Sequence, residues 1–262
     1  AHARGRFPHR NRKPQVNALL LTRTHARIAL LDLFRSPGYV VPTVVFPTLF
    51  YALFDLQYAR TDASVAGATT LAFMAFAVIG VCLYQFGVGI AAERGRPWER
   101  YLRTLPASIA VRFGARIVTA LVFGLLAAGC VAAFSRAATP IDLDSMQWLR
   151  AGIYVVLGGI PFVLMGVTIG YWVSPRAAVP VATAANLLLA YAGGLWLPPQ
   201  YLPKFVEHLS PYLPTRQFAD LLWSVSHGSS AAHALSGLAI YTAIFATIAA
   251  AGYRRDERRR YA

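Results

Sequence analysis

Long blocks of apolar residues without any charged side chain alternate with short polar segments along this chain. Six blocks contain no Asp, Glu, Lys or Arg: 38–54, 66–92, 117–134, 151–173, 177–197 and 234–252. A helix needs about 18 or more apolar residues to cross a bilayer, and each block reaches or approaches that length. The pattern predicts an all-α membrane protein with about six transmembrane helices, over residues 38–56, 66–92, 111–134, 151–173, 177–197 and 234–252.

The segments between these blocks complete the expected architecture. Residues 1–16 are basic and aperiodic and predict a disordered cytoplasmic arm, whereas 17–262 are expected to form a single transmembrane domain. A helix over residues 17–35 would lie in the inner membrane interface before the first span. Residues 198–233 are apolar, aromatic and rich in proline, and predict short outer helices or a re-entrant hairpin before the last span.

The amino-acid composition argues against the alternative that these apolar blocks are buried core helices of a large soluble protein. The chain has 262 residues, of which 56% are hydrophobic and 14% are charged. A soluble domain carries about 25% charged residues. Six apolar helices would therefore leave too little polar chain to cover them.

The distribution of basic residues predicts which way the chain crosses the membrane. With the N-terminus inside, the inner segments hold 20 of the 25 Lys and Arg: eight in 1–37, six in 93–116, Arg176 and five in 253–262. This bias is the positive-inside rule, so both termini are expected to be cytoplasmic in a multi-pass protein of the plasma or inner membrane. The formal charge of +14 is thereby explained without nucleic acid as a partner. Arg112 and Arg116, at the start of the third span, are expected to extend to the inner headgroups.

Motifs for chemistry within the chain are missing from the sequence. No G-x-S-x-G or H-E-x-x-H pattern occurs, and the six histidines show no metal-ligand spacing, so we expect neither a catalytic nor a metal site. A phosphate-binding P-loop needs Gly-Lys-Ser/Thr, but Lys13 precedes Pro14 and Lys204 precedes Phe205. The interiors of the spans contain no carboxylate that could couple transport to protons. Energy for any transport would have to come from another subunit.

The cytoplasmic segment after the second predicted span carries a family resemblance. Residues 92–106 read AERGRPWERYLRTLP, which resembles the pattern E-R-x-x-G-T-x-E-x-L-x-x-x-P of ABC-2-type permeases, the membrane subunits of a class of ATP-driven exporters. Here the glycine comes early, and Pro-Trp replaces the usual small pair. Residues 35–47 and 209–214 are similar to that family's entry into span 1 and its loop before span 6. The resemblance covers nearly the whole chain in order.

In that family the segment forms a coupling helix that rests on the ATPase subunit. The resemblance therefore implies an ATPase-coupling role for Glu93, Arg94, Trp98, Glu99, Arg100 and Arg103, and for Arg176 in the second inner loop. Pro97 suits a first helical turn, and a tryptophan beside arginines is typical of interface anchors. A basic loop that is merely solvated is the alternative. ATP and Mg²⁺ would bind to the partner ATPase, and this chain would hold no cofactor.

The resemblance also implies a second permease chain, identical or different, with substrate passing between the spans of the pair. Candidate residues of this path in spans 1, 2 and 5 are Phe46, Phe50, Tyr51, Phe73, Phe76, Tyr84, Gln85, Asn186 and Tyr191. Because these side chains are aromatic or neutral, an amphipathic drug or lipid-like cargo is expected. Two alternatives stay open: export of a polysaccharide or lipid-linked glycan, and a non-transporting scaffold or accessory subunit of an envelope enzyme.

Overall fold

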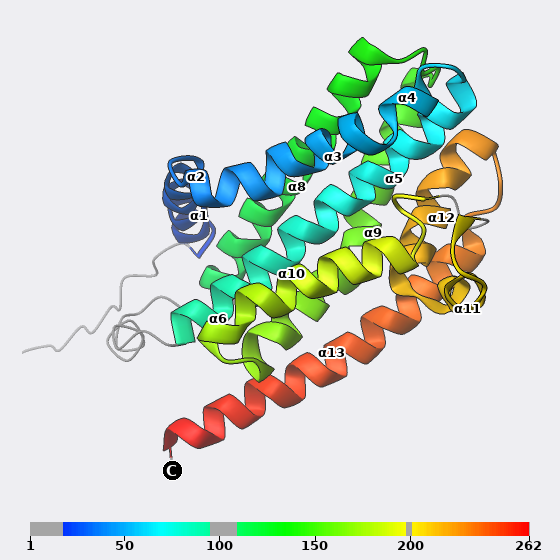
Figure 1. Ribbon diagram of the computed structural model, residues 1–262. Helices are drawn as coiled ribbons and strands as arrows, with labels where there is room; N and C mark the ends of the chain where they lie inside the picture. Colours follow the sequence, from blue (N-terminus) through cyan, green and yellow to red (C-terminus); the bar gives the residue numbers. More distant parts are fainter. Residues whose placement is uncertain (1–17, 95–108, 198–200, 262) are drawn as a thin grey trace, which may run out of the picture.

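A computed structural model of the chain describes residues 18–94, 109–197 and 201–261 (Figure 1). Within these ranges every regular element is a helix, as predicted. The helix α1 (Ala18–Phe34), the end of α6 and the last turns of α13 lie toward one end of the bundle. The short helices α4, α11 and α12 lie toward the opposite end. These are the ends that the charge pattern assigns to the inside and the outside.

Five helical segments of the described chain are long and apolar enough to cross a membrane. They are α2–η1–α3 (Pro37–Val40, Val41–Val45, Phe46–Phe54), α5–η2–α6 (Ala63–Cys82, Leu83–Val88, Gly89–Arg94), α8 (Ile109–Ala138), α9 (Ser145–Trp172) and α13 (Ala232–Tyr261). They match the predicted spans 1, 2, 3, 4 and 6. In spans 1 and 2, η1 and η2 are π-helical turns, a feature that occurs mostly as single turns within α-helices and often at functional sites.

The predicted fifth span, 177–197, corresponds to the shorter helix α10 (Pro175–Ala192). It runs between the same two ends as its neighbours (Figure 1) and contacts span 2 at α5, η2 and α6, but it is not among the five long apolar segments. The helix stops before residue 197 because Gly193 and Gly194 follow it, and Gly194 has a φ of 75°. That conformation suits glycine and ends a helix.

Spans 2 and 4 approach each other closely at glycines of α9. A Cβ on Gly166 would lie 2.7 Å from the Cys82 carbonyl oxygen, and one on Gly170 would lie 2.7 Å from the Ile90 Cβ. Small residues four positions apart let two membrane helices pack backbone to backbone. The inner half of span 2 is therefore held directly against span 4.

The predicted short outer helices are α11 (Lys204–Leu209), η4 (Ser210–Tyr212) and α12 (Pro214–His227). A further short helix, α4 (Leu56–Ala59), follows span 1. The side chain of Phe218 on α12 is fully buried and lies 5.8 Å from the Phe162 ring of α9. The outer helix α12 thus packs into the bundle.

Candidate functional site

The last two described residues of span 2, Glu93 and Arg94, bind different neighbouring spans. Helix α6 ends at Arg94, immediately before residues 95–108, which lie outside the described chain. Glu93 forms an ion pair with Arg116 of α8, whereas Arg94 forms one with Asp256 of α13. The two residues that open the family-like motif are therefore tied to spans 3 and 6.

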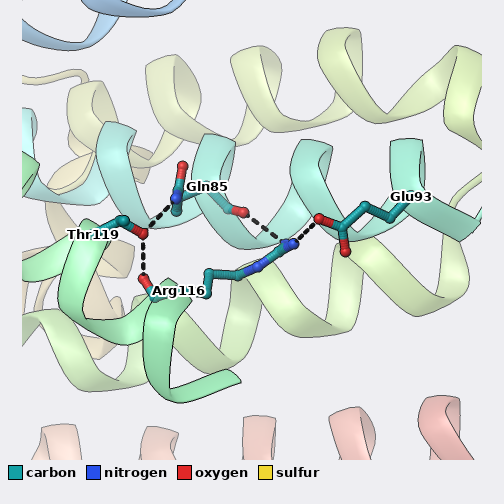
Figure 2. A network of polar contacts seen from close by, with 4 residues as sticks. All are labelled: Gln85, Glu93, Arg116 and Thr119. Carbon is teal, nitrogen blue, oxygen red and sulfur yellow. Dashed lines mark hydrogen bonds and ion pairs between the residues drawn. The ribbon is translucent and has the colours of Figure 1, made fainter. Parts of the chain in front are cut away.

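Arg116 connects the end of span 2 to its π-helical turn (Figure 2). Its Nη2 binds the Glu93 carboxylate, and its Nη1 donates to the Gln85 carbonyl oxygen at 3.0 Å. The Gln85 side-chain amide donates to Thr119 Oγ1 at 2.7 Å, and Thr119 donates to the Arg116 carbonyl oxygen at 2.8 Å. Gly89 makes room for this arrangement, since a Cβ there would lie 2.9 Å from Arg116 Nη1.

The sequence predicts that Arg116 extends to the inner headgroups; in the structure its guanidinium binds Glu93 and the Gln85 carbonyl oxygen. Its side chain is 14% exposed and points along span 2. Glu93 and the Gln85 carbonyl oxygen together satisfy the guanidinium through charge-assisted hydrogen bonds, which are stronger than neutral ones.

Arg94 joins three spans at the inner end. Its Nε donates to Asp256 Oδ1 at 3.0 Å, and its Nη1 donates to the carbonyl oxygens of Gly170 and Tyr171 at 2.6 and 2.9 Å. The guanidinium also lies 5.7 Å from the centre of the Tyr171 ring. The last carbonyls of a helix lack intrahelical donors and carry the negative end of its dipole. Arg94 thus caps α9 while holding α13.

The remaining predicted coupling residues could be located only in part. Trp98, Glu99, Arg100 and Arg103 lie outside the described residues. Arg176 is exposed in the first turn of α10, at the same inner end, where Ser174 Oγ accepts from the Ala177 N–H at 3.4 Å. The structure therefore gathers Glu93, Arg94 and Arg176 at the inner end of the bundle.

The predicted path residues of spans 1 and 2 separate into two groups. Tyr51 and Phe73 are fully buried, and the Tyr51 hydroxyl lies 3.0 Å from Ser135 Oγ of α8, so both pack inside this chain. Phe50 instead joins a partly exposed aromatic cluster, with ring centres 6.0 Å from Phe76 and 5.9 Å from Trp196. Phe46, 44% exposed, extends this cluster along span 1.

A second set of predicted residues lies along the contact between spans 2 and 5. The hydroxyl of Tyr84 lies 2.6 Å from Thr183 Oγ1. Asn186 is buried against Gly80, and its Oδ1 has no hydrogen-bond partner in the described chain. Tyr191 is partly buried on the same helix α10. Gln85 turns away from this contact because its amide is bound to Thr119.

Sequence reasoning missed Asp256, Thr183 and Trp196 as members of these sites. Trp196 stands at the outer end of a predicted span, a position typical of membrane aromatics, and that signal was available. Asp256 is an acidic residue within a basic tail, which was also visible, but its partner lies 162 positions away. Among the described residues, no group of three or more His, Cys, Asp or Glu could hold a metal ion.

Comparison with known proteins decides the family. The sequence model described as "ABC-2 type transporter" matches residues 21–226, well over half of the chain. This chain belongs to the ABC-2 type transporter family. It is also 23% identical, over 200 residues, to a protein of Bacillus subtilis (strain 168) named "Putative transport permease YvfS", with 75% of this chain and 81% of the relative covered. ABC-2 permeases are multi-pass membrane proteins that lack an ATPase site and work with ATPase subunits.

Proposed function

We propose that this ABC-2 permease is the transmembrane subunit of an ATP-driven exporter, with residues 93–103 as the segment that docks on a separate ATPase subunit. ATP and Mg²⁺ bind to that partner, and a second permease chain, identical or different, completes the transporter. Binding of ATP closes the ATPase subunits, the docked segments move, and the spans change between inward-facing and outward-facing arrangements. Membership in a transporter family favours this function over a non-transporting scaffold.

The anchoring of Glu93 and Arg94 is the observation that carries the proposal. A docked segment can drive the spans only if its attachment to them is firm. Span 2 continues into the segment and is tied to span 3 by Arg116, to span 4 through the Gly170 and Tyr171 carbonyls, and to span 6 by Asp256. A displacement of the segment therefore acts on four spans together.

The aromatic cluster supports an amphipathic drug or lipid-like substrate. Phe46, Phe50 and Trp196 are exposed or partly exposed on span 1 and the end of span 5, and they pack over the buried ring of Phe76 on span 2. Aromatic rings give large apolar contact areas for a substrate of this kind. Polysaccharides and lipid-linked glycans remain the rival substrates, and a substrate screen should include them.

Co-reconstitution with the ATPase subunit tests the docking role. Trp98→Ala removes a large apolar anchor, and such a change at an interface costs about 2 kcal/mol, or about thirtyfold in affinity. Glu99→Arg adds a like charge to a basic strip. Both variants should lose ATPase co-purification and substrate-stimulated hydrolysis while the isolated permease keeps its thermal stability. Ile153→Ala, an exposed change in the outer half of α9, serves as the control. Wild-type association of both variants would contradict the proposal.

A further inference from the structure

A cavity of about 290 Å³ opens where the inner ends of α9 and α13 meet. Arg94 lines it from α6, Trp172 from the end of α9, Ser174 from the turn before α10, and Arg255 and Asp256 from α13. Helix α13 is about 45 Å long at 1.5 Å per residue, which exceeds the roughly 30 Å hydrocarbon core. Its last turns therefore project beyond the core on the cytoplasmic side.

The cavity lies at the level of the inner headgroups. The charge-free stretch of the last span ends at residue 252, three positions before Arg255. Trp172, the last residue of α9, is 47% exposed and donates its indole N–H to the Ile248 carbonyl oxygen at 3.1 Å. Tryptophan is enriched at the membrane interface. A ligand of this cavity would thus be met at the boundary between lipid and cytoplasm.

Hydrogen-bond donors without acceptors gather on the cavity wall. Arg94 uses Nε for Asp256 and Nη1 for two carbonyls, and its Nη2 has no acceptor in the described chain. The guanidinium of Arg255 lies 5.0 Å from the centre of the Trp172 ring and forms no ion pair with a described residue. Two arginines against one aspartate leave the wall with a net positive charge. Arginine binds phosphate oxygens with two parallel N–H groups.

An exposed apolar stripe on α13 leads to this cavity. Ile240, Ile244 and Ile248 are 60, 44 and 38% exposed and follow one another at intervals of four residues, so they share one helix face. Arg255 comes seven residues after Ile248, two turns further along the same face. A hydrocarbon chain lying on the isoleucines would end at the guanidinium of Arg255.

We propose that this cavity binds the phosphate headgroup of an anionic phospholipid from the inner leaflet, with the acyl chains lying on Ile240, Ile244 and Ile248. Basic pockets between membrane helices on the cytoplasmic side suit such headgroups. The apolar stripe selects a lipid over a free phosphate ion, which would contact the arginines alone. Lipid binding at this site needs neither the ATPase subunit nor a transported substrate, so it can be tested independently of the exporter function.

Lipid retention by the purified full-length permease tests the site. The protein is reconstituted in phosphatidylcholine nanodiscs in which part of the lipid is phosphatidylglycerol, then transferred to detergent, and the retained lipid is counted by native mass spectrometry. Wild-type protein should retain phosphatidylglycerol above its share of the disc. Arg255→Gln should lower this retention about fivefold, the contribution of one arginine at an anionic surface. Arg254→Gln, at an exposed neighbour outside the cavity, should retain wild-type amounts.

Two further arms separate a lipid from a free anion. Ile244→Asn leaves the charge of the cavity unchanged but should reduce retention, because it interrupts the apolar stripe. Inorganic phosphate, added at the concentration of the lipid headgroup, should not displace the lipid. Equal retention by Arg255→Gln and wild type would overturn the site. Displacement by phosphate, or no effect of Ile244→Asn, would overturn the assignment of a lipid.

Discussion

The inner and outer ends of the bundle tie the same spans together with different chemistry. At the inner end, span 3 binds span 2 through the charged pair Arg116–Glu93. Toward the outer end, span 3 binds spans 1 and 2 through neutral hydroxyls, since Ser135 Oγ lies 2.6 Å from Thr70 Oγ1 and 3.0 Å from the Tyr51 hydroxyl. The outer network is fully buried, whereas Glu93 is 47% exposed.

This difference suggests that the two ends respond differently to salt and to applied movement. Close packing and buried neutral hydrogen bonds depend on shape, so the outer end of this chain should keep its internal contacts while the spans move. The strength of a charged pair near water depends on ionic strength, and its members can exchange partners. At the inner end, several donors also compete for few acceptors. We expect movements imposed by the ATPase to begin where the charged contacts are, and the outer packing to follow as a unit.

The largest expected effect breaks the outer packing. A Cβ on Gly158 of α9 would lie 2.1 Å from the Phe218 ring of α12, so Gly158→Ala forces the two helices apart. Overpacking of a core costs about 3 kcal/mol. Gly152→Ala on the same helix meets no atom within 4 Å and should stabilise by about 0.5 kcal/mol. The free energy of unfolding, measured by SDS titration in mixed micelles, compares the two variants. Equal stability of the pair would show that α12 does not pack as described.

A smaller loss is expected at the inner end, together with a dependence on salt. Arg94→Met removes the hydrogen bonds that this guanidinium donates to the Asp256 carboxylate and to two carbonyls of α9. Loss of a charged, partly exposed hydrogen-bond donor costs about 2 kcal/mol. Because the contact is ionic, the difference from wild type should shrink as salt is raised, whereas the Gly158→Ala difference should not. A salt-independent Arg94→Met effect would remove the distinction between the two ends.

The smallest expected effect lies in the neutral network. Ser135→Ala removes the hydroxyl between Tyr51 and Thr70, although Thr70 keeps its bond to the Ala66 carbonyl oxygen at 2.6 Å. One buried neutral hydrogen bond contributes about 1 kcal/mol. Ser236 is exposed and its hydroxyl donates to the His233 carbonyl oxygen of the same helix, so Ser236→Ala should change stability by less than about 0.5 kcal/mol. The same SDS titration distinguishes them, and a Ser135→Ala protein as stable as Ser236→Ala would argue against the network.

The spans could be predicted because each rests on local composition. Charge-free blocks located spans 1, 2, 3, 4 and 6 to within a few residues at most ends, and the family motif pointed to Glu93 and Arg94. Span 5 was extended too far, since the apolar residues after Gly193 and Gly194 continue the composition of a helix that the backbone has already left. The apolar composition of a segment does not reveal the backbone φ angle at which its helix ends.

Partners across the bundle could not be predicted from the sequence. Arg116 and Glu93 are 23 positions apart, and Arg94 and Asp256 are 162 apart, so only the packed spans bring them together. The positive-inside rule describes the side of the membrane on which basic residues lie and says nothing of their ligands. The burial of Tyr51 and Phe73 could not be predicted either, because the sequence of a span does not distinguish aromatic residues that face lipid, protein or a cavity.

The central claim is that the inner ion pairs transmit movement from the ATPase to the spans, and Asp256→Asn tests it most directly. This change is isosteric and removes the charge that holds Arg94 to span 6, while residues 95–103 keep their sequence. The measurement is substrate-stimulated ATP hydrolysis by the complex in nanodiscs, alongside co-purification of the ATPase subunit. The account predicts that association stays at the wild-type level while stimulation falls severalfold. Wild-type stimulation by Asp256→Asn would contradict it.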